Sequence, residues 1–420
     1  MKTRIAITGI GVVAPNGVGV HAFETALRHQ ISGISFLPNL ADLSFACQVG
    51  GVPDVSEELL TQRFDPLTRR MLTSSGIQFG IIAAWEAWEM ARLPVSKDET
   101  FWHIGTCFGT GLAGVEPLRD AIYQVDQKQV RRLGSRVVEQ TMPSGIAAYL
   151  TGIFGLGGPV STNSSACATG TESVILAAEA IRLGKAKVML AGSCDSYGPH
   201  IWGGFDSMRV LARHSNDQPE RASAPLSANA SGFVPAAGAG ALILEDWQHA
   251  IDRGAPILAE YLDGASLAGG QRSGGTMTAP NPQGVQRCLM AAMKQADLQP
   301  HEIDLISGHL TSTMGDRAEV SHWATVLQGH FPYLQAPKAY IGHCLAAAGA
   351  IEAVSCVIQL KEKFVFGNAN SRPLHPDIAA IWPEEKIPTQ TLSLSEVRVV
   401  AKSSFGFGDV NACFFLKRCE

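Results

Sequence analysis

Short hydrophobic runs alternate with longer amphipathic runs along the chain. The hydrophobic runs predict strands at 4–8, 102–106, 188–191, 240–245, 305–307 and 397–402. The longer runs, whose apolar residues recur at helical spacing, predict helices at 21–29, 75–90, 172–183, 284–295 and 348–360. Strands that alternate with helices in this way indicate an α/β architecture.

Two of the predicted helices follow similar segments. The segment SACATG at 165–170 precedes the helix at 172–183, and IGHCL at 341–345 precedes the helix at 348–360. The strand-then-loop layout at 104–107 is likewise similar to that at 306–309. Each pair has one member in each half of the chain. The sequence therefore predicts two related halves, 1–250 and 251–420, packed in one body with converging strand ends.

Composition narrows the class of protein. Of 420 residues, 46% are hydrophobic and 17% are charged, which indicates a well-buried globular chain. The net charge of −5 gives no general affinity for nucleic acid. There is no apolar stretch of about 18 residues, so we expect no membrane insertion. The nine cysteines form no CxxC pair and no Cys/His cluster, which favours free thiols in a reducing cytoplasm and no metal site.

Two glycine-rich segments imitate a dinucleotide-binding fingerprint. They are GIGVVA at 9–14 and GTGLAG at 109–114, and each follows a predicted strand. The fingerprint requires a helix that starts inside the motif, so that its N–H groups meet the pyrophosphate. Pro15 prolongs a loop after the first segment, and Pro117 interrupts the second. We therefore interpret both as glycine turns.

Cys167 is the first candidate for chemistry. It lies in NSSACATG at 163–170, directly before the small-residue helix that stops near Gly184. Unpaired N–H groups and the positive end of the helix dipole at such a start favour the nucleophilic thiolate. A buried structural cysteine is the alternative for this segment, since free cysteines are often buried.

Three later segments add partners for this thiol. His309 lies in the hydroxyl-rich loop SGHLTSTMGD, and Lys338 precedes His343 by five residues at the start of a small-residue helix. The loop SFGFG at 404–408 lies near the C-terminus. A cysteine with two histidines and a lysine suits acyl-thioester chemistry.

On these motifs, in this order, the chain resembles the β-ketoacyl-acyl carrier protein synthases over nearly its whole length. The resemblance implies a thiolase-like α/β fold of two pseudo-symmetric halves in an αβαβα arrangement, and a homodimer. It implies no cofactor, because acyl and malonyl groups arrive on the phosphopantetheine arm of acyl carrier protein. The implied reaction is decarboxylative condensation of malonyl-acyl carrier protein with an acyl group on Cys167, in fatty acid or polyketide biosynthesis.

The resemblance also implies roles for individual residues. Cys167 would carry the acyl group, and the N–H groups of Cys167 and Phe407 would form the oxyanion hole, with Phe407 as a gate. His309 and His343 would stabilise the enolate. Lys338 would orient the site. The further roles implied are an acidic partner for Lys338 at Glu352, structural support from Asp316 and Glu319, phosphopantetheine contacts at Thr311 and Thr313, an acyl-pocket floor at Phe108, and a carrier-protein patch at Arg69, Arg70, Arg131, Arg132 and Arg209.

Several residues depart from the usual family pattern. Leu310 and Asp409 replace glycines, Ala237 replaces a glutamate, and Met314 replaces a Pro-x pair. Because none of these removes a catalytic group, they suggest a divergent branch that uses a specialised polyketide or an unusual acyl chain. The sequence leaves four alternative functions open. The chain could be the active subunit of a heterodimer with a chain-length factor, or a non-catalytic chain-length subunit, although such subunits usually lack this cysteine. It could also be a coenzyme A thiolase or a Cys/His hydrolase.

Overall fold

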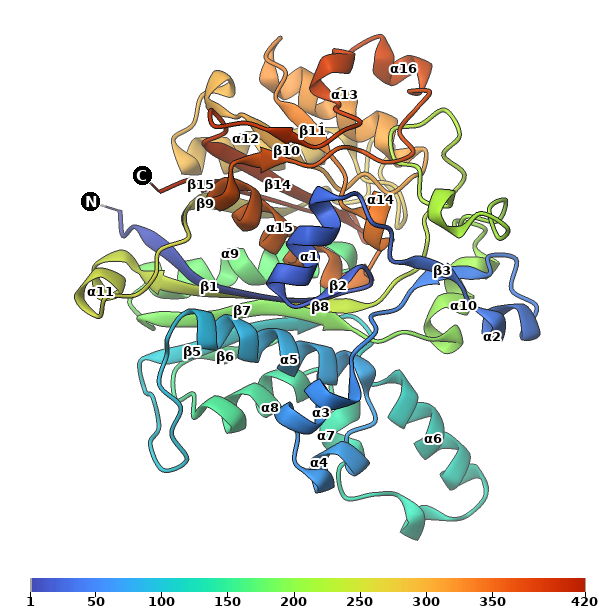
Figure 1. Cartoon of the computed structure of the whole chain (residues 1–420), viewed down its shortest axis with the longest axis vertical. Helices are drawn as coiled ribbons and strands as arrows, with labels where there is room; N and C mark the ends of the chain where they lie inside the picture. Colours follow the sequence, from blue (N-terminus) through green and yellow to red (C-terminus); the bar gives the residue numbers. More distant parts are fainter. Residues whose placement is uncertain (1, 420) are drawn as a thin grey trace.

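A computed structural model describes residues 2–419 and has one large mixed sheet (Figure 1). Its strands follow the order β11-β10-β14-β15-β9-β1-β8-β7-β5-β6, and β2 pairs with β1 outside this path. The strands are β1 (Ile5–Ala14), β2 (Gly17–Val18), β5 (Ile104–Thr110), β6 (Val160–Ser161), β7 (Val188–Asp195), β8 (Gly238–Asp246), β9 (Ala259–Ala268), β10 (Leu305–Ser307), β11 (Tyr333–Gln335), β14 (Val399–Gly406) and β15 (Val410–Lys417). Two small sheets pair β3 (Ile34–Phe36) with β4 (Val49–Gly51), and β12 (Phe364–Val365) with β13 (Leu392–Ser393).

The strand directions repeat in the two halves of this sheet. From the centre outwards, β1, β8 and β7 are antiparallel neighbours, and β5 and β6 then follow parallel to β7. In the other half β9, β15 and β14 are antiparallel, and β10 and β11 follow parallel to β14. β1 and β9 join the halves at the centre. The predicted pseudo-symmetric fold is thereby confirmed, whereas the division of the chain near residue 250 stays a prediction.

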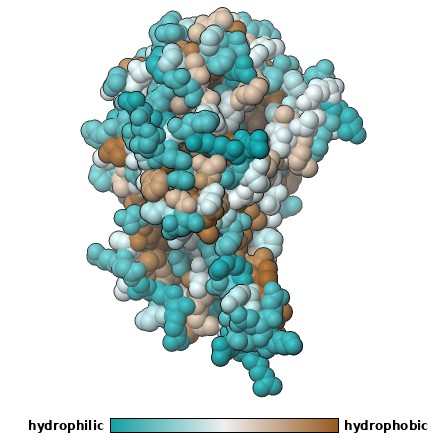
Figure 2. Space-filling model, turned by 90° about the vertical axis from the view of Figure 1, so that its right-hand side faces the viewer, coloured by the Kyte–Doolittle hydropathy of each residue, from teal (hydrophilic) through white to brown (hydrophobic). Residues whose placement is uncertain are grey.

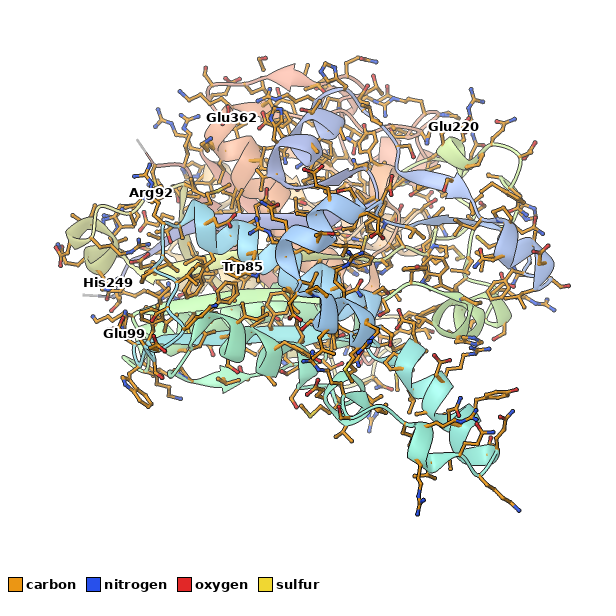
Figure 3. The ribbon with its side chains drawn as sticks, turned by 60° about the horizontal axis from the view of Figure 1, so that its bottom comes forward. Trp85, Arg92, Glu99, Glu220, His249 and Glu362 are labelled. Atoms are coloured by element: carbon orange, nitrogen blue, oxygen red, sulfur yellow. The ribbon has the colours of Figure 1, made fainter. Side chains whose placement is uncertain are left out.

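Helices form three layers around the two halves of the sheet (Figure 1). α5 (Ser75–Met90) and α8 (Gly145–Phe154) cover one outer face, where Trp85 of α5 packs edge-on against Phe154 with ring centroids 4.8 Å apart (Figure 3). α12 (Pro282–Ala296) and α13 (Gly315–Leu327) cover the other outer face. α9 (Thr169–Arg182) and α15 (Ala348–Glu362) lie between the two sheet halves. This is the αβαβα arrangement.

The two central helices approach closely because the second residue of each is glycine, Gly170 in α9 and Gly349 in α15. A Cβ atom on Gly170 would lie 2.3 Å from the backbone nitrogen of Ala350, and one on Gly349 would lie 2.5 Å from that of Thr171. Contacts this short leave no room for a side chain. The crossing therefore brings the turn before α9 next to the turn before α15.

Smaller helices complete the described chain. They are α1 (Val20–Arg28), α2 (Pro38–Asp42), α3 (Glu57–Arg63), α4 (Pro66–Met71), α6 (Val115–Asp126), α7 (Val137–Thr141), α10 (Pro199–Ser207), α11 (Trp247–Asp252), α14 (Lys338–Ile341) and α16 (Pro376–Ala379). Every strand and helix predicted from the sequence is present. The central strands β9 and β15 were not predicted. Across residues 2–419, the helices are all too short or too polar to cross a bilayer.

Candidate active site

Cys167 lies on the 3-10 turn η2 (Ala166–Ala168) that leads into α9. Ala166 has a φ of 49°, a left-handed conformation that turns the chain sharply. The Thr169 side chain fixes this turn, since its Oγ1 donates to the Ala166 carbonyl at 2.7 Å and accepts from the Ser165 N–H at 2.9 Å. The residue Cys167 keeps partial solvent exposure.

The second half of the molecule contributes two imidazoles to this thiol. His309 follows β10, and His343 follows α14. The Cys167 Sγ and one ring nitrogen of each histidine all lie within 4.8 Å of one another. The two rings meet edge to face, with centroids 5.3 Å apart and an interplanar angle of 82°. The structure thus gathers the three side chains that the motifs indicated. A divalent cation could bind these atoms only in place of an acyl group.

Two backbone N–H groups face the sulfur. They belong to Cys167 and to Phe407, and both favour the thiolate by pointing at Sγ. Gly406 makes this possible, because a Cβ atom there would lie 2.6 Å from the Ser165 carbonyl oxygen and 3.3 Å from the Cys167 nitrogen. The Phe407 ring is half-buried and lies 6.2 Å from the Phe205 ring. The geometry fits the oxyanion hole that the resemblance implied, whose role, like that of Phe407 as a gate, stays a prediction.

The ionisation of the thiol corrects the expectation from the sequence. Burial raises the pKa of the Cys167 thiol to about 11, and it outweighs the Lys338 ammonium and the two N–H groups, which lower the pKa. The free enzyme therefore holds a thiol at neutral pH, although the turn was expected to favour a thiolate. A base must remove the proton when the thiol attacks.

A neutral histidine with an open ring nitrogen can be that base. Burial, reinforced by the Lys338 ammonium, holds the pKa of both His309 and His343 well below the usual value, so both rings are neutral near pH 7. The Nδ1 of His343 accepts from the Leu345 N–H at 3.2 Å, which puts the ring proton on Nε2. Among residues 2–419, none donates to or accepts from the Nδ1 of His309.

Behind the imidazoles lies a buried ion cluster. Lys338, at the start of α14, pairs with Glu352 of α15, as the resemblance implied. The second oxygen of Glu352 lies 2.9 Å from the Nζ of Lys402 in β14. Lys402 was not predicted, because a lysine at the end of an apolar strand resembles a solvent-exposed residue. Its one sequence signal is its position directly before the SSFGFG segment.

The loop that carries His309 is held by two buried carboxylates. Glu319 accepts from the N–H groups of His309 and Leu310, both at 2.8 Å. Asp316 accepts from the N–H groups of Thr311 at 2.7 Å and Leu226 at 2.9 Å. Burial raises the pKa of both acids, that of Asp316 to about 6. The structural support role is consistent with these contacts.

The other predicted contact residues occupy different places. The hydroxyls of Thr311 and Thr313 lie 2.9 Å apart, half-buried on the His309 loop. Of the five arginines predicted to bind the carrier protein, Arg69 pairs with Glu57. The other four are exposed: Arg70, Arg131, Arg132 and Arg209. A hydrogen bond of 3.3 Å from Arg136 to Thr68 joins the two segments that carry the first four of the predicted arginines.

Phe108 lies in the hydrophobic core between the sheet and the outer helices. A cavity of about 160 Å³ at the end of β5 is lined instead by residues such as Leu112, Met142 and Ile146. The role of Phe108 at an acyl-pocket floor therefore stays a prediction.

The residues that depart from the family pattern differ in burial and contacts. Leu310 and Ala237 are buried in the core, and Met314 is 78% exposed. Asp409 is buried with a φ of 62°, and its carboxylate accepts from the N–H groups of Gln271 and Asn281, both at 2.9 Å. Asp409 thus ties the Phe407 loop to the 269–281 loop.

Comparison with known proteins agrees with this site. The description "Beta-ketoacyl synthase, N-terminal domain" matches residues 2–250, and "Beta-ketoacyl synthase, C-terminal domain" matches residues 259–372. The chain is 33% identical to 3-oxoacyl-[acyl-carrier-protein] synthase I, chloroplastic, of Arabidopsis thaliana, over 98% of this chain and 86% of that protein. It is 31% identical to 3-oxoacyl-[acyl-carrier-protein] synthase 1 of Escherichia coli (strain K12), over 99% of both chains.

A solved structure has the same architecture. It is a type II PKS acyl-carrier protein in complex with its ketosynthase bound to the hexaketide, and it superposes with a TM-score of 0.88 and 27% identity, covering 100% of both chains. The matched domains cover most of the sequence, and the site contains the cysteine, the two histidines and the lysine in one cluster. The chain is a member of the β-ketoacyl synthase family.

Proposed function

We propose that this chain condenses an acyl group held on Cys167 with malonyl-acyl carrier protein and releases carbon dioxide. The observation that carries the proposal is the meeting of one thiol with two neutral imidazoles and two backbone N–H donors. The acyl carrier protein partner is supported by the names of the relatives and by the carrier-protein complex of the structural neighbour. Since the substrates bring their own phosphopantetheine arm, the reaction requires no further cofactor.

The first half-reaction is acyl transfer to Cys167. As an imidazole takes the thiol proton, Sγ attacks the carbonyl carbon of the acyl thioester. The oxyanion accepts hydrogen bonds from the N–H groups of Cys167 and Phe407. The C–S bond to the phosphopantetheine then breaks, and that thiolate leaves with the proton.

The second half-reaction forms the new carbon–carbon bond. The malonyl thioester loses its carboxylate as CO2, and the bonding electron pair moves to the thioester carbonyl as an enolate. The enolate oxygen accepts a hydrogen bond from the Nε2–H of His343 and one from His309. The enolate carbon attacks the acyl carbonyl, the bond to Sγ breaks, and the β-ketoacyl thioester remains on the carrier protein. The Cys167 thiolate that leaves takes up one proton from solvent and returns to the thiol.

Intact-mass measurement tests the first step directly. Acyl-acyl carrier proteins of different chain lengths are incubated with the enzyme, and one acyl mass per chain is expected on Cys167. Cys167→Ala is expected to abolish the mass shift, and Cys356→Ala, which changes another buried free thiol, should keep it. Acyl loading followed only by hydrolysis, with no β-ketoacyl product, would contradict condensation.

The carrier-protein patch is proposed at the exposed arginines. Acyl carrier proteins are acidic, so local positive charge would steer them in spite of the net charge of −5. Reversing Arg131 and Arg132 to Glu is expected to raise the KM for the carrier protein with little change in kcat. An unchanged KM would exclude these two residues.

We propose that one face of the molecule is the interface of a homodimer, or of a heterodimer with a related subunit. β6 is the last strand of the sheet and exposes Val160, and α6 exposes apolar side chains that include Leu118, Ile122 and Tyr123. Figure 2 faces the side on which α6 lies and shows hydrophobic surface between hydrophilic lobes in its lower part. Light scattering of the chain alone, and with a co-expressed related subunit, distinguishes the two assemblies.

The nine free thiols support a cytoplasmic location, which is part of the same proposal.

A further inference from the structure

Lys402 is a second buried lysine beside the reacting groups. Its side chain is fully buried in β14, the strand that ends at the Phe407 loop. The Nζ lies 2.9 Å from Glu352 Oε2, while Lys338 pairs with Glu352 Oε1. One buried carboxylate therefore lies between two buried ammonium groups.

The remaining contacts of Lys402 join this cluster to the helix that begins at the nucleophile. Its Nζ donates to the Ser403 carbonyl and, at 3.1 Å, to the Ser404 hydroxyl. The Ser404 hydroxyl is 2.8 Å from that of Thr171 in α9. The network thus runs from α15 through β14 to α9. Of these elements, α15 follows His343, β14 leads to Phe407, and α9 follows Cys167.

The charges around this network do not cancel within the cluster. Lys338, Glu352 and Lys402 together carry one excess positive charge. Glu319 is the other acid that faces Lys402, and its carboxylate is bound to the N–H groups of His309 and Leu310. Lys338 and Lys402 both act electrostatically on His309 and on His343. With Glu319 counted, two carboxylates face two ammonium groups, and Lys402 supplies the second of the two positive charges that act on the imidazoles.

We propose that Lys402 is a positioning residue of the condensation site, which shares Glu352 with Lys338 and thereby adds a second positive charge beside the two imidazoles. The inference rests on the proposed function, because the charge has a role only when an enolate forms. Fixed charge in a buried site stabilises a developing anion without reorganisation at the moment of reaction. Removing Lys402 should then slow the step that forms the enolate more than the acyl transfer to Cys167.

Lys402→Met keeps the length of the side chain and removes the charge. We expect about a tenfold or greater fall in the rate of malonyl-acyl carrier protein decarboxylation, and less than about a threefold change in acyl loading of Cys167. The matched control is Lys361→Met, which removes an exposed lysine paired with Glu362 on α15 and should leave both rates unchanged. Thermal melting shows that each variant is folded.

A second variant separates charge from structure. Glu352→Gln combined with Lys402→Met leaves Lys338 as the one charge of the cluster and restores the net positive charge. We expect this double variant to decarboxylate faster than Lys402→Met alone. If Lys402→Met fails to fold, the double variant, which buries no unpaired carboxylate, still tests the inference, and it should decarboxylate within about tenfold of the wild-type rate.

Three outcomes would overturn the inference. They are a wild-type decarboxylation rate in folded Lys402→Met, equal losses in loading and decarboxylation, and a double variant slower than the single one. The wild-type enzyme, assayed in parallel, distinguishes the two levels of failure. Wild-type enzyme that loads acyl groups but forms no β-ketoacyl product would refute the proposed function and the inference together, whereas an active wild type with an unaffected Lys402→Met would refute the inference alone.

Discussion

The two halves of the molecule build the same turn twice and use it differently. The turn η2 before α9 contains Ala166 with a φ of 49°, and the turn η5 (Leu345–Ala347) before α15 contains Leu345 with a φ of 51°. In each case the end of a central strand from the other half lies against the turn. By this correspondence Ala346 in the second half occupies the position of Cys167.

The difference lies in what the strand end presents. At η5 the strand β7 ends in Asp195, whose carboxylate accepts from the Ala346 N–H at 2.9 Å. At η2 the strand β14 ends in Gly406, which has no side chain and leaves the Cys167 N–H pointing at Sγ. The fold thus supplies two anion-binding turns. One is filled by the protein's own carboxylate, whereas the strand end at the other has no side chain and, under the proposed function, leaves room for a transient oxyanion.

Filling the free turn should have the largest effect. Gly406→Ala would place a methyl group 2.6 Å from the Ser165 carbonyl oxygen and separate β14 from η2. Because both oxyanion donors depend on this contact, we expect acyl loading of Cys167 to fall by about 100-fold or more. The control is Gly204→Ala in α10, where a Cβ would have no neighbour within 4 Å. Near-normal loading by folded Gly406→Ala would refute the comparison.

The thiols beside the two turns should differ in reactivity and in its pH dependence. Burial raises the pKa of Cys167 to about 11, and it raises that of the fully buried Cys344 as well. Below its pKa a thiol gains thiolate about tenfold per pH unit, so alkylation of Cys167 by iodoacetamide should rise about 100-fold between pH 7 and 9. Cys344 should remain unmodified in the folded enzyme. Peptide mass mapping measures both, and a Cys167 rate that levels off near pH 7 would restore the thiolate expected from the sequence.

Emptying the filled turn should affect stability rather than chemistry. The Asp195 carboxylate accepts from the N–H groups of Ala346, Leu112 and Gly111, at 2.9, 2.7 and 3.1 Å. Asp195→Ala leaves these buried donors without a partner, and we expect the free energy of unfolding to fall by about 2–4 kcal/mol. Urea denaturation measures this loss, and Asp120→Ala at an exposed site is the control. If Asp195→Ala instead lowers acyl loading more than about tenfold and leaves the free energy of unfolding unchanged, Asp195 has a chemical role.

The same comparison explains what the sequence could predict. The run 188–191 is apolar over its whole length and 348–360 is mostly apolar, so burial predicts their structure without any partner. Cys167, His309 and His343 were found because each opens or follows an element at a recognisable motif. Lys402 and Asp195 were missed because each is a charged residue within a strand, and only the other half of the molecule supplies its partner. The state of the Cys167 thiol was misjudged for the same reason, since its burial depends on segments far away in the sequence.

The smallest expected effect concerns the cavity near Asp195, where an acyl chain could lie. Leu112 donates its N–H to Asp195 and lines the cavity of about 160 Å³ at the end of β5, whereas Phe108 packs in the core. Leu112→Ala enlarges the cavity, so we expect a few-fold shift of acyl loading towards longer primers. Phe108→Leu is expected to cost about 1–2 kcal/mol of stability without changing that preference. Competition among acyl-acyl carrier proteins of different lengths, read by intact mass, compares the two variants. A shift in Phe108→Leu alone would place the pocket floor at Phe108, where the family resemblance put it, and would show that an acyl chain reaches past Leu112 into the core.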